Sequence, residues 1–268
     1  MSFMSWFKRG RSAEASTVQQ SEPTRYETGF VKLMIMFGIP VTDPAEGDGP
    51  PPRMIVRGNW QRIVTLRPDE FGYPYGTIPR KILLWLAGRA RETGSRTVDL
   101  GATPEEFTAQ LGLAPHMARE VVWQTQRLFG AQLTLGDGTI KPGTPKTVTL
   151  RVAEEFRLWN SHRGSVTLAE LLWRSISEHP SPVDWEKVRD CGLSAIAMDF
   201  YAWLNLLAVM DLDEPQQLSW ARLEELFGHQ LEPAQFRTEL EAAVAQVGPL
   251  VPQAEVGLTD RGLTVGPA

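Results

Sequence analysis

Residues 77–130 read TIPRKILLWLAGRARETGSRTVDLGATPEEFTAQLGLAPHMAREVVWQTQRLFG, and their pattern decides the fold that we expect. Apolar side chains at helical spacing predict a helix over residues 79–92, and TVDLG at 97–101 predicts a short strand. Thr103 begins a second helix, because Thr is a good N-cap and is followed here by Pro and, three positions on, by Glu. After the tight turn GLAP, a third helix covers residues 116–129.

Two candidate strands follow, AQLTL at 131–135 and KTVTLRV at 146–152, joined by a loop rich in Gly and Pro. Helix, strand, helix, turn, helix and hairpin is the element order of a winged helix-turn-helix domain. The same order recurs in the second half, with helices expected over 194–210, 221–228 and 233–247, a short strand at 217–220 and a closing hairpin. The sequence therefore predicts an α+β, mainly α fold of two tandem winged helix-turn-helix domains.

The expected boundaries divide the chain into three parts. Residues 1–25 form a flexible leader, residues 26–160 an N-terminal winged-helix DNA-binding domain, and residues 161–268 a C-terminal winged-helix domain. SVTL at 165–168 opens the second half in this interpretation.

The charge of the chain is distributed unevenly between these parts. The net charge of the 268 residues is −5, which by itself argues against a nucleic-acid partner. Residues 53–163, however, carry sixteen basic and ten acidic side chains, a net +6, whereas residues 164–268 carry six basic and sixteen acidic side chains, a net −10. Such asymmetry is typical of a chain whose halves face different partners, although a solvated acidic surface gives the same pattern.

The third helix of the first half carries a polar face suited to DNA. At 100° per residue its outward side collects His116, Arg119, Glu120, Trp123 and Arg127, flanked by Gln124 and Gln126. Arg and Gln side chains match the edges of guanine and adenine in the major groove. We therefore expect base contacts from Arg119, Gln124, Gln126 and Arg127, with His116 beside them. Trp123 is expected to stack on a sugar or to contact a thymine methyl group.

Phosphate contacts are expected from four basic residues outside that face, which are Arg80, Lys81, Lys141 and Lys146. The alternative is a solvated helix with incidental arginines. The corresponding helix of the second half, residues 233–247, turns small and weakly acidic side chains outward. Because such a face neutralises phosphates poorly, we expect it to pack against protein.

Motifs for catalysis, metal binding and cofactor binding are missing from the sequence. It has no GxxxxGK[ST] phosphate loop, and the four histidines lack the spacing of a metal site. Cys191 has no basic neighbour and is expected to be a small buried residue. Apolar runs are too short to span a membrane, and no signal peptide is visible. We expect a soluble protein of a reducing compartment that holds no cofactor, and nothing in the residues proposes a reaction mechanism.

Several blocks resemble the plasmid-encoded RepA replication initiator family. YPYGTIPRKILLWLAGRARETGSRTVDLG (73–101) looks like the hallmark block of that family, and SPVDWEKVRDCGLSAIAMDFYAWLNLLAVM (181–210) is similar to its C-terminal block. FVKLMIMFGIPVTDP (30–44) and RGNWQRIVTL (57–66) resemble its N-terminal portion, so that the similarity extends over residues 30–268.

The resemblance implies a non-enzymatic protein that binds repeated sites, or iterons, in double-stranded plasmid origin DNA and recruits host replication proteins. A homodimer formed through the second half is also open. Two alternatives remain from the residues themselves: a winged-helix transcriptional repressor, and an interaction scaffold that has lost DNA binding.

Overall fold

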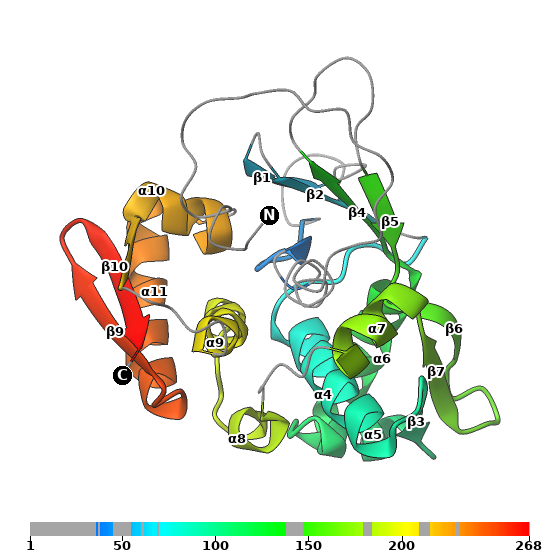
Figure 1. The fold of residues 1–268 in the computed structure, drawn as a ribbon. Helices are drawn as coiled ribbons and strands as arrows, with labels where there is room; N and C mark the ends of the chain where they lie inside the picture. The colour runs from blue at the N-terminus through cyan, green and yellow to red at the C-terminus, as the bar shows by residue number, and fades with distance from the viewer. Residues whose placement is uncertain are drawn as a thin grey trace.

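The computed structural model describes residues 36, 38–44, 55–59, 62–68, 70–137, 147–178, 184–208, 215–228 and 231–267 (Figure 1). The expected leader at residues 1–25 lies outside this set.

The first half contains the predicted order of helices around a small antiparallel sheet. Helix α4 (Thr77–Thr93) leads to β3 (Thr97–Gly101), α5 (Pro104–Gln110), the 3-10 turn η1 (Pro115–Met117) and α6 (Ala118–Gly130). The N-cap of α5 is Thr103, whose side chain accepts a hydrogen bond from the backbone N–H of Glu106, as the capping pattern predicts. Strand β3 pairs with β7 (Gly164–Leu168), which pairs with β6 (Ala153–Arg157). We call these elements the first unit.

The hairpin expected at 131–152 forms, but it does not belong to the sheet of the first unit. Strands β4 (Gln132–Asp137) and β5 (Thr147–Leu150) pair with each other, and β4 also pairs with β2 (Arg62–Arg67). With β1 (Ile55–Asn59) they form a separate sheet in the order β1-β2-β4-β5. The expectation that this hairpin is the wing is therefore wrong; the hairpin beside β3 is β6–β7. The local residue pattern predicts that a segment forms a strand, but it does not predict which other strand it pairs with, because pairing depends on residues far away in the sequence.

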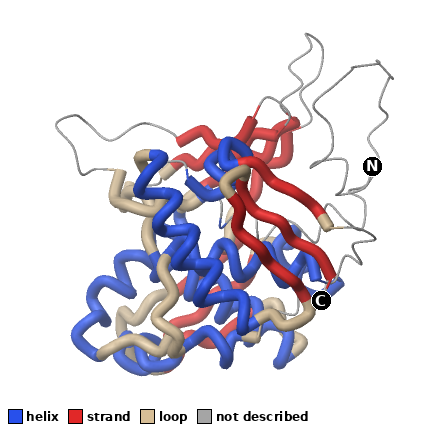
Figure 2. Tube along the Cα trace, turned by 90° about the vertical axis from the view of Figure 1, so that its left-hand side faces the viewer, coloured by secondary structure: helices blue, strands red, loops and turns tan. Residues whose placement is uncertain are grey.

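The second half repeats the element order of the first unit. Helix α9 (Ala195–Ala208) is followed by β8 (Gln216–Ser219), α10 (Trp220–Leu223) with the π-helical turn η2 (Glu224–Gly228), and α11 (Pro233–Val247). The turn η3 (Gly248–Leu250) leads to the hairpin β9 (Ala254–Thr259) and β10 (Gly262–Pro267). The strand order β8-β10-β9 matches β3-β7-β6. We call these elements the second unit; Figure 2 shows its C-terminal strands as the long strands that lead toward the C label.

Two helices connect the units, α7 (Glu170–Glu178) and α8 (Trp185–Arg189). The expected boundary at residue 160 places 165–168 in the second half, but these residues form most of β7 and complete the sheet of the first unit. The described residues thus divide after Leu168.

Helix α4 is the central element of the core. Its residues 78–87 are all buried, because it packs against α6 of its own unit, against α7 and α8, and against α9 of the second unit. One continuous apolar core therefore runs through both units. No helix among the described residues is long and apolar enough to cross a membrane.

Candidate nucleic-acid interface

The outward face of α6 is the centre of the candidate interface. Helix α6 forms because Val121, Leu128 and Phe129 recur at helical spacing and are buried against the core. On the opposite side His116 and Arg119 are exposed, and Trp123 keeps 41% of its surface in solvent. A large exposed indole on a folded surface is a candidate contact for a ligand or partner.

Arg119 and Trp123 form a stacked pair on that face. They are four residues apart, one helical turn, and the guanidinium carbon of Arg119 lies 4.3 Å from the centroid of the Trp123 ring. The guanidinium makes no hydrogen bond or ion pair with any described residue. Its donors are therefore available to a partner. Gln126, further along α6, is partly exposed.

Gln124 does not belong to the outward face. Its side chain is 1% exposed; Oε1 accepts a hydrogen bond from the backbone N–H of Tyr75 at 3.0 Å, and Nε2 donates to Oε1 of Glu120 at 2.9 Å. Both ends of the amide are used inside the protein. The expected role of Gln124 in base recognition is therefore corrected to attachment of the segment before α4.

Arg127 supports the same segment. Its Nε donates to the backbone oxygen of Phe71 at 2.9 Å, and its guanidinium carbon lies 5.4 Å from the centroid of the Tyr75 ring. Burial raises the pKa of the Tyr75 phenol, and a hydrogen bond from Arg127 opposes that shift. Arg127 is half-buried, so it holds the chain before α4 against α6 instead of projecting freely.

Arg80 is a structural residue, not the phosphate contact that we expected. It is 0% exposed, and its Nε and Nη2 donate to the two carboxylate oxygens of Asp199 at 2.8 Å each. Its remaining donors reach four backbone oxygens, those of Met36, Ile39, Pro40 and Gly76. Because all its donors are used and it is enclosed, DNA cannot reach it without unfolding α4 from α9.

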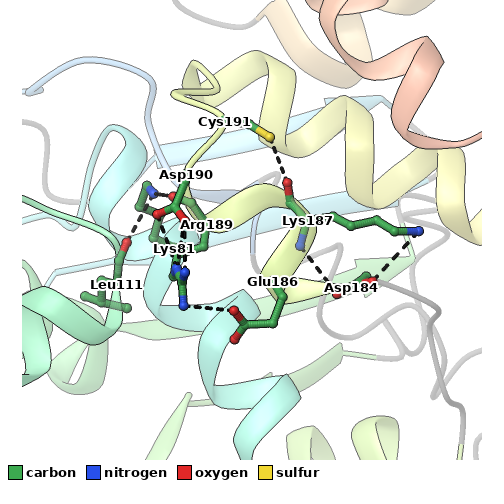
Figure 3. Close-up of polar contacts among 8 residues, drawn as sticks. All are labelled: Lys81, Leu111, Asp184, Glu186, Lys187, Arg189, Asp190 and Cys191. Atoms are coloured by element: carbon green, nitrogen blue, oxygen red, sulfur yellow. Dashed lines mark hydrogen bonds and ion pairs between the residues drawn. The ribbon is translucent and has the colours of Figure 1, made fainter.

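Lys81 is also buried, at the junction between the units (Figure 3). Its Nζ donates to the backbone oxygens of Leu111 at 3.1 Å and Arg189 at 2.5 Å, and lies 5.6 Å from the centroid of the Trp185 ring. Burial lowers the pKa of the Lys81 ammonium, because desolvation penalises its charge. The expected phosphate contact at Lys81 is corrected to a clamp between the end of α5 and the end of α8.

The turn after α5 contacts α8 directly at the same place. Gly112 has φ +66°, and a Cβ added there would lie 2.8 Å from the backbone oxygen of Arg189 and 2.8 Å from Oδ1 of Asp190. Arg189 in turn pairs with Asp190 and with Glu186 of α8 (Figure 3). The turn that leads into α6 is thus seated on the segment that connects the units.

The hairpin β6–β7 carries basic residues that sequence reasoning did not select. Arg157, His162 and Arg163 are exposed at its end. Arg163 donates to Oδ2 of Asp99 at 2.9 Å; a backbone hydrogen bond from Gly101 and this contact together hold the pKa of Asp99 below its usual value. Only the pairing of β7 with β3 identifies these residues as neighbours of the first unit. Lys141 and Lys146, the other expected phosphate contacts, lie outside the described residues.

Residues for metal or nucleophilic chemistry do not gather in the described part of the chain. It contains no group of three or more His, Cys, Asp and Glu side chains that could hold a metal ion. Cys191 was expected to be buried but is exposed, and its Sγ donates to the backbone oxygen of Lys187 at 2.7 Å.

No protein family and no curated protein matches the chain. Among solved structures it is similar to domains 2 and 3 of RctB, with a TM-score of 0.56 and 10% identity over 88% of this chain and 98% of that one. A second crystal structure of RctB domains 2–3 has a TM-score of 0.47 and 10% identity over 79% of this chain and 88% of that one. The first match shows that the mixed helix and strand fold is shared.

Proposed function

We propose that this protein is a replication initiator that binds double-stranded DNA through the first unit. The observation that carries the proposal is the outward face of α6, where Arg119 stacks on the exposed Trp123 and makes no hydrogen bond or ion pair with any described residue. The fold shared with domains 2 and 3 of RctB, a replication initiator, supports it. We further propose that both units are winged helix-turn-helix domains, since each combines the same element order with the same strand order.

The proposed DNA-binding surface consists of α6 and the β6–β7 hairpin. Residues near the start of a recognition helix contact base edges, and Arg119 is the second residue of α6. We propose that His116, Arg119, Trp123 and Gln126 face the bases, and that Arg157 and Arg163 lie near phosphates. The net charge of +6 over residues 53–163 favours approach of this half to DNA.

The proposed plasmid origin, repeated binding sites and host partners follow from the resemblance to the RepA family. We propose a bacterial, cytoplasmic, plasmid-encoded initiator of that type, which is not an enzyme, binds repeated origin sites and recruits host replication proteins. The second unit, with a net charge of −10 over residues 164–268, is proposed to contact protein, including a second protomer. The outward face of α11 agrees with this role, since Ala234, Ala242 and Ala245 are exposed there.

The test compares two exposed arginines, each on the third helix of its unit and each stacked on a tryptophan. Arg119 stacks on Trp123, and Arg237 of α11 lies 4.5 Å from the centroid of the Trp220 ring. Arg119→Ala and Arg237→Ala remove the same charge from an exposed site. We expect Arg119→Ala to weaken binding to origin duplex roughly 5- to 150-fold and Arg237→Ala to change it by less than about twofold.

Binding is measured across a salt series, in which log affinity should fall with log salt by about 0.9 per phosphate neutralised. Equal effects of the two substitutions would contradict the assignment of the first unit as the DNA-binding one. A permanganate footprint separates an initiator from a repressor on the same fold, because only an initiator exposes unpaired thymines beside its binding sites.

A further inference from the structure

The stacked pair on α6 has a geometry that selects particular bases. We infer that Arg119 and Trp123 together recognise a G·C base pair next to an A·T base pair, with Arg119 on the guanine and Trp123 on the thymine methyl group. This inference rests on the proposed DNA binding by the first unit and adds the chemical identity of the target.

The guanine preference follows from how Arg119 is held. A guanidinium presents two parallel N–H donors, which match O6 and N7 of guanine in the major groove. Stacking on Trp123 at 4.3 Å restricts the side chain, and none of its donors is used by another described residue. A restrained fork with free donors loses little conformational entropy when it binds a guanine edge, which strengthens the contact, and the match of its two donors to O6 and N7 discriminates against other bases.

The thymine preference follows from the exposure of the indole. Trp123 leaves 41% of its surface in solvent although it is apolar, and apolar side chains recognise thymine by contact with its C5 methyl group. The guanidinium carbon of Arg119 and the centroid of the Trp123 ring lie 4.3 Å apart, and neighbouring base pairs are about 3.4 Å apart. Because these two distances are similar, the two side chains can contact adjacent base pairs when α6 lies in the groove.

The other polar side chains of α6 do not compete for these bases. Gln124 is buried and bonded to Tyr75 and Glu120, and Arg127 is bonded to Phe71. Oε1 of Glu120 accepts a hydrogen bond from Gln124, although its second carboxylate oxygen can still accept another. The donors on this face are therefore those of the stacked pair, with His116 and Gln126 at its two ends.

The experiment begins with selection of bound sequences from a random duplex pool by the full chain. We expect enriched duplexes to contain a guanine pair beside a thymine pair. The best duplex is then made in two altered forms: 7-deazaguanine replaces the guanine and removes N7, or deoxyuridine replaces the thymine and removes only the methyl group. Wild-type affinity should fall about tenfold with the first change and several-fold with the second.

Two variants connect each base atom to one side chain. Arg119→Ala should bind the guanine and 7-deazaguanine duplexes equally within about twofold, and Trp123→Ala should do the same for thymine and deoxyuridine. Arg237→Ala is the matched control and should keep both sensitivities. Urea unfolding confirms that the variants remain folded, which is expected because both side chains are exposed.

Two results would overturn the inference, and they are distinguishable. If the protein binds duplex with steep salt dependence but enriches no such step, or if the variants keep full sensitivity to both altered bases, the base assignment is wrong and DNA binding stands. If no pool or origin duplex is bound at any salt concentration, the proposed function and the inference both fall.

Discussion

At the scale of single residues, an arginine is buried or exposed according to the hydrogen-bond and ion-pair partners that the fold offers it. Arg80 and Arg119 both lie in the first turn of a helix. Arg80 is nevertheless buried with Asp199, whereas Arg119 remains on the surface. A buried charge is tolerated only with a partner and with its other donors satisfied, and Asp199 together with four backbone oxygens meets that need. The ion pair therefore attaches α4 to α9.

Asp199→Asn tests this role of the ion pair. The amide keeps the shape of the carboxylate but leaves the Arg80 charge buried without an opposite charge, so we expect the free energy of unfolding to fall by about 3–5 kcal/mol. Urea denaturation, monitored by circular dichroism, measures this free energy of unfolding. Arg163→Ala is the control: it breaks the exposed contact with Asp99 and should cost about 0–1 kcal/mol. A loss of less than 1 kcal/mol in Asp199→Asn would show that the pair contributes little.

At the scale of elements, the position of α6 depends on the turn before it. That turn is held from outside its own unit: Lys81 binds the backbone oxygens of Leu111 and Arg189, and Gly112 fits against Arg189 and Asp190. The place of the turn was predictable, because TPEE marks the start of the helix before it and GLAP follows the end of that helix. Its docking on α8 was not, since 108 residues separate Lys81 from Arg189.

Alanine substitutions at two glycines with nearly equal φ separate the contribution of that docking to stability from the cost of the backbone conformation. Gly94 has φ +61° with no atom within 4 Å of an added Cβ, whereas Gly112 has φ +66° and meets the Arg189 backbone. Alanine at either position pays for left-handed φ, about 1–2 kcal/mol. We expect Gly112→Ala to cost about 1–3 kcal/mol more than Gly94→Ala in urea denaturation, because it also forces the turn off α8. Equal costs would mean that the contact yields easily.

At the scale of the whole molecule, the two units share one core. Helix α4 is buried on the side of its own unit and on the side of α9, and the Arg80–Asp199 pair lies between them. The charge division of the chain is therefore not a division into independent bodies. The surface proposed to bind protein on the second unit and the surface proposed to bind DNA on the first are connected through a packed interior.

A chain ending at Leu168 tests this dependence. It keeps every strand and helix of the first unit but exposes the side of α4 that α7, α8 and α9 cover. We expect such a chain to lose the single cooperative urea transition of the full protein and to bind a hydrophobic dye, because a large apolar surface is left without a cover. A cooperative transition with the near-ultraviolet spectrum of a packed domain would show that the first unit folds alone.

The sequence by itself determined the local elements: the helices of both units, the capping of α5 by Thr103, and the outward position of Arg119 and Trp123. Periodicity and capping act within a few residues, so they are visible in a linear chain. Tertiary structure alone decided which strands pair, that Arg80, Lys81 and Gln124 turn inward, and that β7 completes the first sheet. Those outcomes depend on distant partners, from Tyr75 at 49 residues from Gln124 to Asp199 at 119 residues from Arg80, which no local pattern can specify.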